Sequence, residues 1–123
     1  MPFSIGILLK HSFRLTKNED ISRVRHEGTT YVHATVVLGV LPNRMDINRV
    51  AVIAGRSVGK AVQRNFAKRR LRSAYLHFQE NLHQGYDLVF VARKPLIAID
   101  YAKFIKALGT ILDQAGLMKE NVS

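Results

Sequence analysis

The hydrophobic positions along the chain follow two different periods. Val, Leu and Ile are concentrated in residues 31–41, 49–54 and 87–92, which predicts three β-strands. After Asp87 the third stretch is continuously apolar, so we expect it to be a central strand of its sheet. A turn at residues 42–43 separates the first two strands, and Pro95 follows the third.

Two shorter segments carry signals for helix ends. Thr16 and Glu19 have the spacing of a capping box, which predicts a short helix that ends near Gly28. Asp100 is placed to cap a second helix through Ala115. One apolar stripe of this second helix comprises Phe104, Leu108, Ile111, Leu112 and Ala115.

The longest helical pattern covers about residues 58–82 and has two faces. At about 100° per residue, its apolar side chains share one stripe that must pack against the sheet. That stripe comprises Ala67, Leu71, Ala74, Tyr75, Phe78 and Leu82. An adjacent arc, about 100° wide, is polar and mostly cationic. It comprises Asn65, Lys68, Arg69 and Arg72 at positions i, i+3, i+4 and i+7.

Length and composition limit the class of protein. A chain of 123 residues with 47% hydrophobic residues accommodates one globular domain, residues 1–123, with a core at about 14–116. No apolar stretch is long enough to cross a membrane, and the short apolar residues 5–9 lack the flanks of a signal peptide. The absence of cysteine excludes disulfides and thiolate metal sites. We therefore expect a cytoplasmic protein without a membrane partner.

The formal net charge of +10, from nineteen basic and nine acidic residues, predicts a polyanionic partner. Residues 56–72, called here the basic segment, contain no acidic residue. Their cations are Arg56, Lys60, Arg64, Lys68, Arg69, Arg70 and Arg72. Like charges one helical turn apart repel, and solvated helix faces usually mix signs. Because arginine binds phosphate bidentately and stacks on bases, the basic segment favours folded RNA.

Other chemistry is less well supported by the sequence. Residues 55–61 resemble a phosphate-binding loop, but the loop is one residue short and Ala61 stands where Ser or Thr should follow the lysine. His77 and Glu80 share a helix face, yet no further metal ligand is recognisably spaced. A metal-dependent nuclease assembled from distant loops, a DNA-binding module and a structural rRNA-binding protein of the ribosomal type remain as alternatives.

One family resemblance favours a particular RNA-binding role. Arg64-Asn65, Lys68-Arg69 and Arg72, preceded by residues 59–62, closely resemble the signature helix of the bacterial ribonuclease P protein component. The similarity extends to residues 14–20, 28, 49–50 and 91–95. The resemblance implies an α+β fold, a two-layer αβββαβα sandwich with a left-handed βαβ crossover, like domain 2 of ribosomal protein S5.

The resemblance also implies a division of labour in which this chain carries no catalytic residue. In that family the RNA subunit removes the 5′ leader of precursor tRNA with Mg²⁺ ions held mainly by RNA. The protein binds the RNA subunit and the precursor tRNA with its leader, and no protein partner is evident. The implied RNA-binding residues are Arg56, Lys60, Arg64, Asn65, Lys68, Arg69 and Arg72.

The chain departs from the family pattern at two places. Phe66 stands where the family's Arg-Asn-Arg signature has its second arginine, so this position loses a cation. In the cleft that binds the leader, Ile21, Arg25 and Gly39 replace residues that are commonly aromatic. Arg25 offers stacking or a phosphate contact instead, whereas Ile21 fits a core role equally well. The predicted leader-binding residues are Phe13, Ile21, Arg25 and Tyr31.

Overall fold

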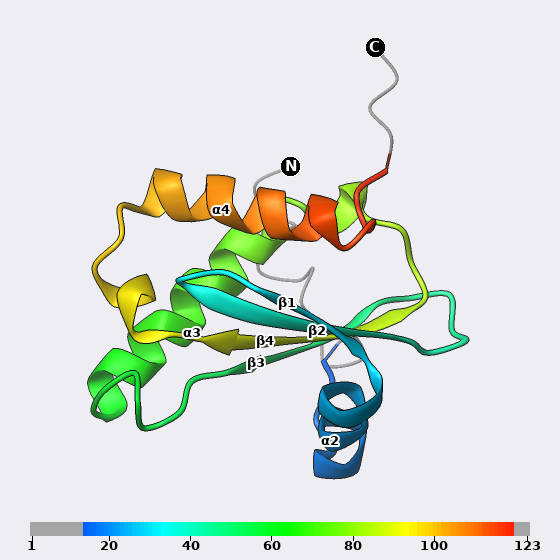
Figure 1. Cartoon of the computed structure of the whole chain (residues 1–123), viewed down its shortest axis with the longest axis horizontal. Coiled ribbons are helices and arrows are strands. Elements are labelled where there is room, and N and C mark those ends of the chain that lie inside the picture. The colour runs from blue at the N-terminus through cyan, green and yellow to red at the C-terminus, as the bar shows by residue number, and fades with distance from the viewer. Residues whose placement is uncertain (1–13, 120–123) are drawn as a thin grey trace.

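The computed structural model describes residues 14–119, which form a four-stranded sheet with helices on both faces (Figure 1). The elements are α2 (Asn18–Glu27), β1 (Thr29–Val32), β2 (Val36–Pro42), β3 (Arg49–Ile53), α3 (Ala61–Leu76), β4 (Tyr86–Ala92) and α4 (Tyr101–Gln114), with the 3₁₀ turns η3 (Gln79–Asn81) and η4 (Lys94–Ile97). The order of helices and strands is the predicted αβββαβα. Within the described range, no helix is long and apolar enough to span a membrane.

The strand order is β1-β2-β4-β3. β2 pairs antiparallel with both β1 and β4, whereas β3 pairs parallel with β4, and α3 makes the connection between these two parallel strands. Phe90 of β4 lies opposite Leu38 on one side and Val52 on the other. The prediction that residues 87–92 form a central strand is confirmed.

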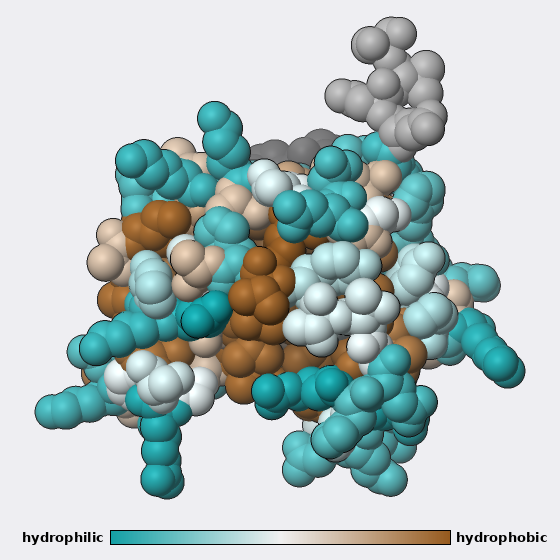
Figure 2. Space-filling view, viewed as in Figure 1, coloured by the Kyte–Doolittle hydropathy of each residue, from teal (hydrophilic) through white to brown (hydrophobic). Residues whose placement is uncertain are grey.

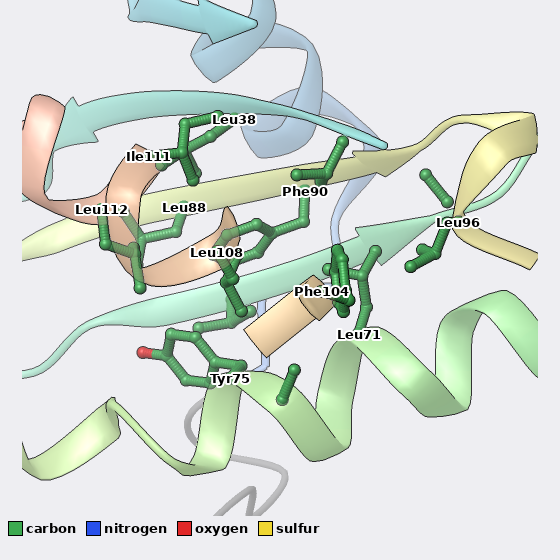
Figure 3. Packing of buried hydrophobic residues seen from close by; sticks show 14 of the residues in the cluster. Leu38, Leu71, Tyr75, Leu88, Phe90, Leu96, Phe104, Leu108, Ile111 and Leu112 are labelled. Carbon is green, nitrogen blue, oxygen red and sulfur yellow. The ribbon is translucent and has the colours of Figure 1, made fainter. Parts of the chain in front are cut away.

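The main core lies between the sheet and the helices α3 and α4 (Figure 3). The predicted stripes are buried there at Ala67, Leu71, Ala74 and Tyr75 of α3, and at Phe104, Leu108, Ile111 and Leu112 of α4. The ring of Tyr75 meets that of Phe90 edge to face, with centroids 5.6 Å apart. Burying one stripe of α3 leaves its remaining surface free to carry the basic segment.

The short helix α2 adds a partial layer on the opposite face of the sheet. Its residue Val24 is fully buried against the sheet. An ideal Cβ on Gly39 of β2 would lie 3.2 Å from the Val24 side chain. At Gly28 a Cβ would lie 2.5 and 2.6 Å from two backbone carbonyl oxygens, so only glycine fits. The predicted two layers therefore describe the α3 and α4 side, and α2 supplies a third, incomplete one.

Arg49 joins α2 to the sheet through two carboxylates. Its guanidinium donates two hydrogen bonds, of 2.9 and 2.7 Å, to the buried carboxylate of Asp87, and it lies 3.7 Å from Asp20 of α2. The hydrogen bond to Asp87 is the main cause that raises the pKa of Arg49, against an opposing effect of burial. The contact with Asp20 thus ties α2, which lies over β2 and β4, to the ion pair between β3 and β4.

Two boundaries near the N-terminus were predicted wrongly. The expected strand 31–41 is two strands, because the chain turns back at residues 33–35. In this turn the backbone N–H of Thr35 donates to Nδ1 of His33 at 3.1 Å, a local bond without a Gly or Pro signal. The Thr16 capping box is also wrong, since the N-cap of α2 is Lys17, without a side-chain cap bond.

The bounds of the long helix were also too wide. α3 begins at Ala61, because Gly59 has φ +146° and Val58 leaves the helical path to enter the core. It ends at Leu76, and Leu82 reaches the core from beyond η3. By contrast, the predicted cap at Asp100 is confirmed, since its carboxylate accepts the N–H of Lys103 at 3.3 Å.

Candidate RNA-binding surface

The basic segment begins in a loop that is anchored in the core. After β3 ends at Ile53, Val58 anchors the loop in the core with 1% of its surface exposed. Gln63, in the first turn of α3, accepts the backbone N–H of Lys60 at 2.7 Å. This bond satisfies one of the free N–H groups at the helix start, so Lys60 and Arg56 extend from an ordered loop.

The structure places the predicted polar arc on one exposed side of α3. Asn65 and Arg69 are exposed, whereas Lys68 and Arg72 are half-buried at the border with the core stripe. None of the ion pairs among residues 14–119 includes a cation of the basic segment, so no acidic side chain of this range pairs with this surface. Figure 2 shows long hydrophilic side chains projecting from the end of the molecule where α3 begins. A dense, uncompensated positive surface attracts phosphate.

Arg70 has a different role from the other cations of the basic segment. Its guanidinium donates hydrogen bonds to the carbonyl oxygens of Leu96, at 3.0 Å, and of Ile99, at 2.6 Å. Its Cζ also lies 5.1 Å from the ring centroid of Phe66 and 5.4 Å from that of Tyr101. Arg70 therefore joins α3 to the connection between β4 and α4 instead of facing a ligand.

Arg14 joins the basic surface from a distant part of the sequence. It forms a parallel bridge with Val50 at the outer edge of β3, and Leu15 donates its N–H to the same residue at 2.8 Å. This pairing brings Arg14 and Arg72 to one hollow beside the sheet edge. Partial burial, and to a lesser degree the charge of Arg14, lowers the pKa of Arg72.

Sequence reasoning did not propose Arg14 as a site residue, because its neighbourhood depends on the pairing with β3. The only signal was its position in the family-like stretch 14–20. Two arginines that are far apart in the sequence thus line one hollow, and the charge of one acts on the other.

A groove on the α2 side of the sheet contains part of the predicted leader site. Arg25 and Thr30 stand at its wall, and the floor is formed by Val37, Gly39, Val89 and Val91. Ile21 and Arg25, one turn apart on α2, also share a shallow hollow on that helix. Ile21 is half-buried against the small α2 core, and it also lines the hollow that it shares with Arg25.

Tyr31, a further predicted leader residue, does not line this groove. Tyr31 packs against the main core, on the opposite face of the sheet, because successive residues of a strand point to opposite faces and its neighbour Thr30 lines the groove. A stacking platform at Tyr31 would therefore lie on the other face of the sheet from Arg25. Phe13 lies outside the described residues.

The part of the chain from 14 to 119 brings together no group of three His, Cys, Asp or Glu side chains that could hold a metal ion. His77 instead lies against Tyr101, with ring centroids 6.4 Å apart. Its pairing with Glu80 therefore gains no third ligand from the fold.

Comparisons with known proteins agree with the fold and with the family resemblance. The Ribonuclease P family profile matches residues 9–116. A ribonuclease P protein component of Dehalococcoides mccartyi is 37% identical over 112 residues, which cover 91% of this chain and 92% of that protein.

A solved RNase P protein mutant of Staphylococcus aureus has a TM-score of 0.83 at 22% identity, covering 92% of this chain and 96% of that one. The RNase P protein of Thermotoga maritima has a TM-score of 0.74 at 27% identity, with 82% and 96% covered. This chain belongs to the ribonuclease P protein component family, the protein part of an endoribonuclease.

Proposed function

We propose that this protein binds the RNA subunit of ribonuclease P through the basic segment and helps that RNA to remove the 5′ leader from precursor tRNA. The observation that carries the proposal is the arc of Asn65, Lys68, Arg69 and Arg72, which no described acidic side chain neutralises, in a member of this family. Hydrolysis would depend on Mg²⁺ ions held mainly by the RNA. The protein's contribution is binding and positioning.

The geometry of α3 suits the backbone of a folded RNA. From Asn65 to Arg72 the helix rises about 10 Å, so one face presents several donors to neighbouring phosphates. Arg69 and Arg72 offer planar forks for phosphate oxygens, and Lys68 adds a compact charge beside them. Arg56 and Lys60 extend the same charge beyond the helix start. Each phosphate contact releases counterions, so binding should weaken steeply with salt.

The groove beside α2 suits a single-stranded leader. Its floor of Val37, Val89 and Val91 is apolar, and Arg25 at its wall can stack on a base or pair with a phosphate. Without aromatic residues at these positions, we expect the leader to be held with little preference among bases. The hollow of Arg14 and Arg72 lies along β3, at the opposite edge of the sheet from β1, and is proposed to hold a further phosphate.

The deciding experiment combines purified protein and labelled precursor tRNA at low magnesium, with and without a ribonuclease P RNA. We expect leader removal only when the RNA is present, and faster removal when the protein is added. A precursor with a one-nucleotide leader is the control, because it cannot fill the groove and should gain less from the protein.

Two results would contradict the proposal. Leader removal by the protein alone, after rigorous elimination of contaminating nucleases, would make this chain the catalyst. Binding to ribosomal RNA without any effect on leader removal would favour a structural RNA-binding role instead.

A further inference from the structure

Phe66, where this chain departs from the family signature, belongs to a column of side chains on one face of α3. Val62, Phe66 and Arg70 follow one another at intervals of four residues, so their side chains lie one above another on the helix. Val62 is 78% exposed, although it is a large hydrophobic residue, and Phe66 is half-buried. The column therefore presents apolar surface to solvent within the basic segment.

Phe66 and Arg70, the C-terminal part of this column, are held in place by contacts within the protein. The Arg70 guanidinium is fixed by two carbonyl acceptors, those of Leu96 and Ile99, and lies over the Phe66 ring. A cation against an aromatic ring restrains the ring's orientation, so Phe66 is pre-organised before any ligand arrives. Val62, one turn earlier on the other side of Phe66 from Arg70, leaves this side of the column open.

The surroundings of the column determine what can occupy it. Exposed Arg69 lies about 60° around the helix from Phe66, at the near edge of the cationic arc. An occupant must therefore combine a flat apolar group with negative charge a short distance away. An unpaired nucleotide has this combination, because its base has a π-face and its phosphate is anionic. An apolar protein segment or a lipid tail lacks the charge beside the flat group.

We propose that Phe66 is a stacking platform for an unpaired base of the ribonuclease P RNA, with Val62 extending the platform and Arg69 binding an adjacent phosphate. This inference rests on the proposed function, because it assumes that this RNA docks on α3. At this position the chain exchanges the family's phosphate-binding cation for a base-binding ring. The loss of one charge is thus accompanied by a different contact to the same RNA.

The test compares RNA affinity across a series of salt concentrations for the parent protein and for Phe66→Leu, Phe66→Tyr and Phe66→Arg. Leucine keeps an apolar side chain but removes the π-face, so we expect binding roughly 5- to 100-fold weaker, with an unchanged salt slope. Tyrosine should restore the affinity. Arginine adds a cation and should steepen the slope by about 0.7 to 0.9.

A matched control is Phe78→Leu, which removes another half-buried ring. Phe78 follows the end of α3 and packs against the main core. Its ring lies next to Gly109 of α4, where an added Cβ would be 3.1 Å from it. We expect this variant to bind the RNA as the parent does. The melting temperature of each free variant separates a loss of fold from a loss of contact.

The outcomes distinguish this inference from the proposed function. If the parent does not bind ribonuclease P RNA, the proposed function fails. If the parent binds and stimulates cleavage but Phe66→Leu binds equally well, or lowers the salt slope, only the stacking platform is wrong. A loss seen only with precursors that carry a leader would assign the base to the leader and overturn the proposal as stated.

Discussion

Lys68 and Arg70 are two cations of the basic segment to which the structure gives opposite roles, and replacing each by methionine tests this distinction. Both substitutions remove one positive charge and keep a long, flexible side chain. Lys68 belongs to the uncompensated arc, whereas Arg70 donates to the carbonyl oxygens of Leu96 and Ile99. We expect Lys68→Met to affect RNA binding and Arg70→Met to affect stability.

The magnitudes follow from the contacts of each side chain. Six cations of the basic segment remain when Arg70 is set aside, and together they can contribute a slope of about 4 to 5 to the fall of log K for the RNA with log salt. Lys68→Met should lower this slope by about 0.7 to 0.9 and change the free energy of unfolding by less than about 0.5 kcal/mol. Arg70→Met removes two charged hydrogen bonds and the ring contacts, which should cost about 2 to 5 kcal/mol and lower the melting temperature by roughly 10 °C.

The assay is filter binding or fluorescence anisotropy with ribonuclease P RNA over a range of salt, together with thermal and urea denaturation of the free proteins. If Arg70→Met lowers the salt slope as much as Lys68→Met and leaves stability intact, Arg70 contacts phosphate. The assignment of its charge to the internal structure would then be refuted.

Three further predictions concern the fold that positions the site. Asp87→Ala leaves the Arg49 guanidinium without its main acceptor. We therefore expect the free energy of unfolding from urea denaturation to fall by about 3 to 5 kcal/mol. A loss below about 1 kcal/mol would show that the ion pair contributes little to stability. Gly28→Ala forces a Cβ against two carbonyl oxygens and should cost at least about 1 to 3 kcal/mol, whereas Gly55→Ala, with nothing within 4 Å of its Cβ, should leave the melting temperature nearly unchanged. Burial raises the pKa of Tyr75 above its ordinary value of 10.0, so above that pH the unfolded chain releases a proton that the folded protein retains. Stability should then fall by about 1.4 kcal/mol per pH unit from this residue, and Tyr75→Phe should make the melting temperature less sensitive to pH between about 9 and 11, while an unchanged sensitivity would contradict the burial argument.

Much of the fold could be predicted because its signals are local. The stripe of Leu71 and Tyr75 and the arc of Lys68 and Arg72 are separated by helical periodicity alone, and the structure places both where the periodicity indicates. Asp100 has a side chain that can cap only the helix directly after it. Such signals need no knowledge of what packs against the element.

The boundaries could not be predicted as well, since they depend on competing local bonds and on the core. The turn at His33 and Thr35 lacks a Gly or Pro signal and is closed by a side-chain to backbone bond. That turn makes β1 a separate strand, and its register against β2 turns Tyr31 away from the groove. Val58 continues the helical pattern in sequence, but Gly59 in a positive-φ conformation keeps it outside α3.

By itself, the sequence determined that this chain has a helix with a core stripe beside a cationic arc, and its motif indicated the family to which the chain belongs. The physical reason is that both depend on residue spacing along one element. Only the tertiary structure decided which cations remain available. Arg70 is engaged by carbonyl oxygens 26 and 29 residues away, and Arg14 reaches Arg72 through the edge of β3. The role of a charge depends on the partners that the fold brings to it, and periodicity carries no information about those partners.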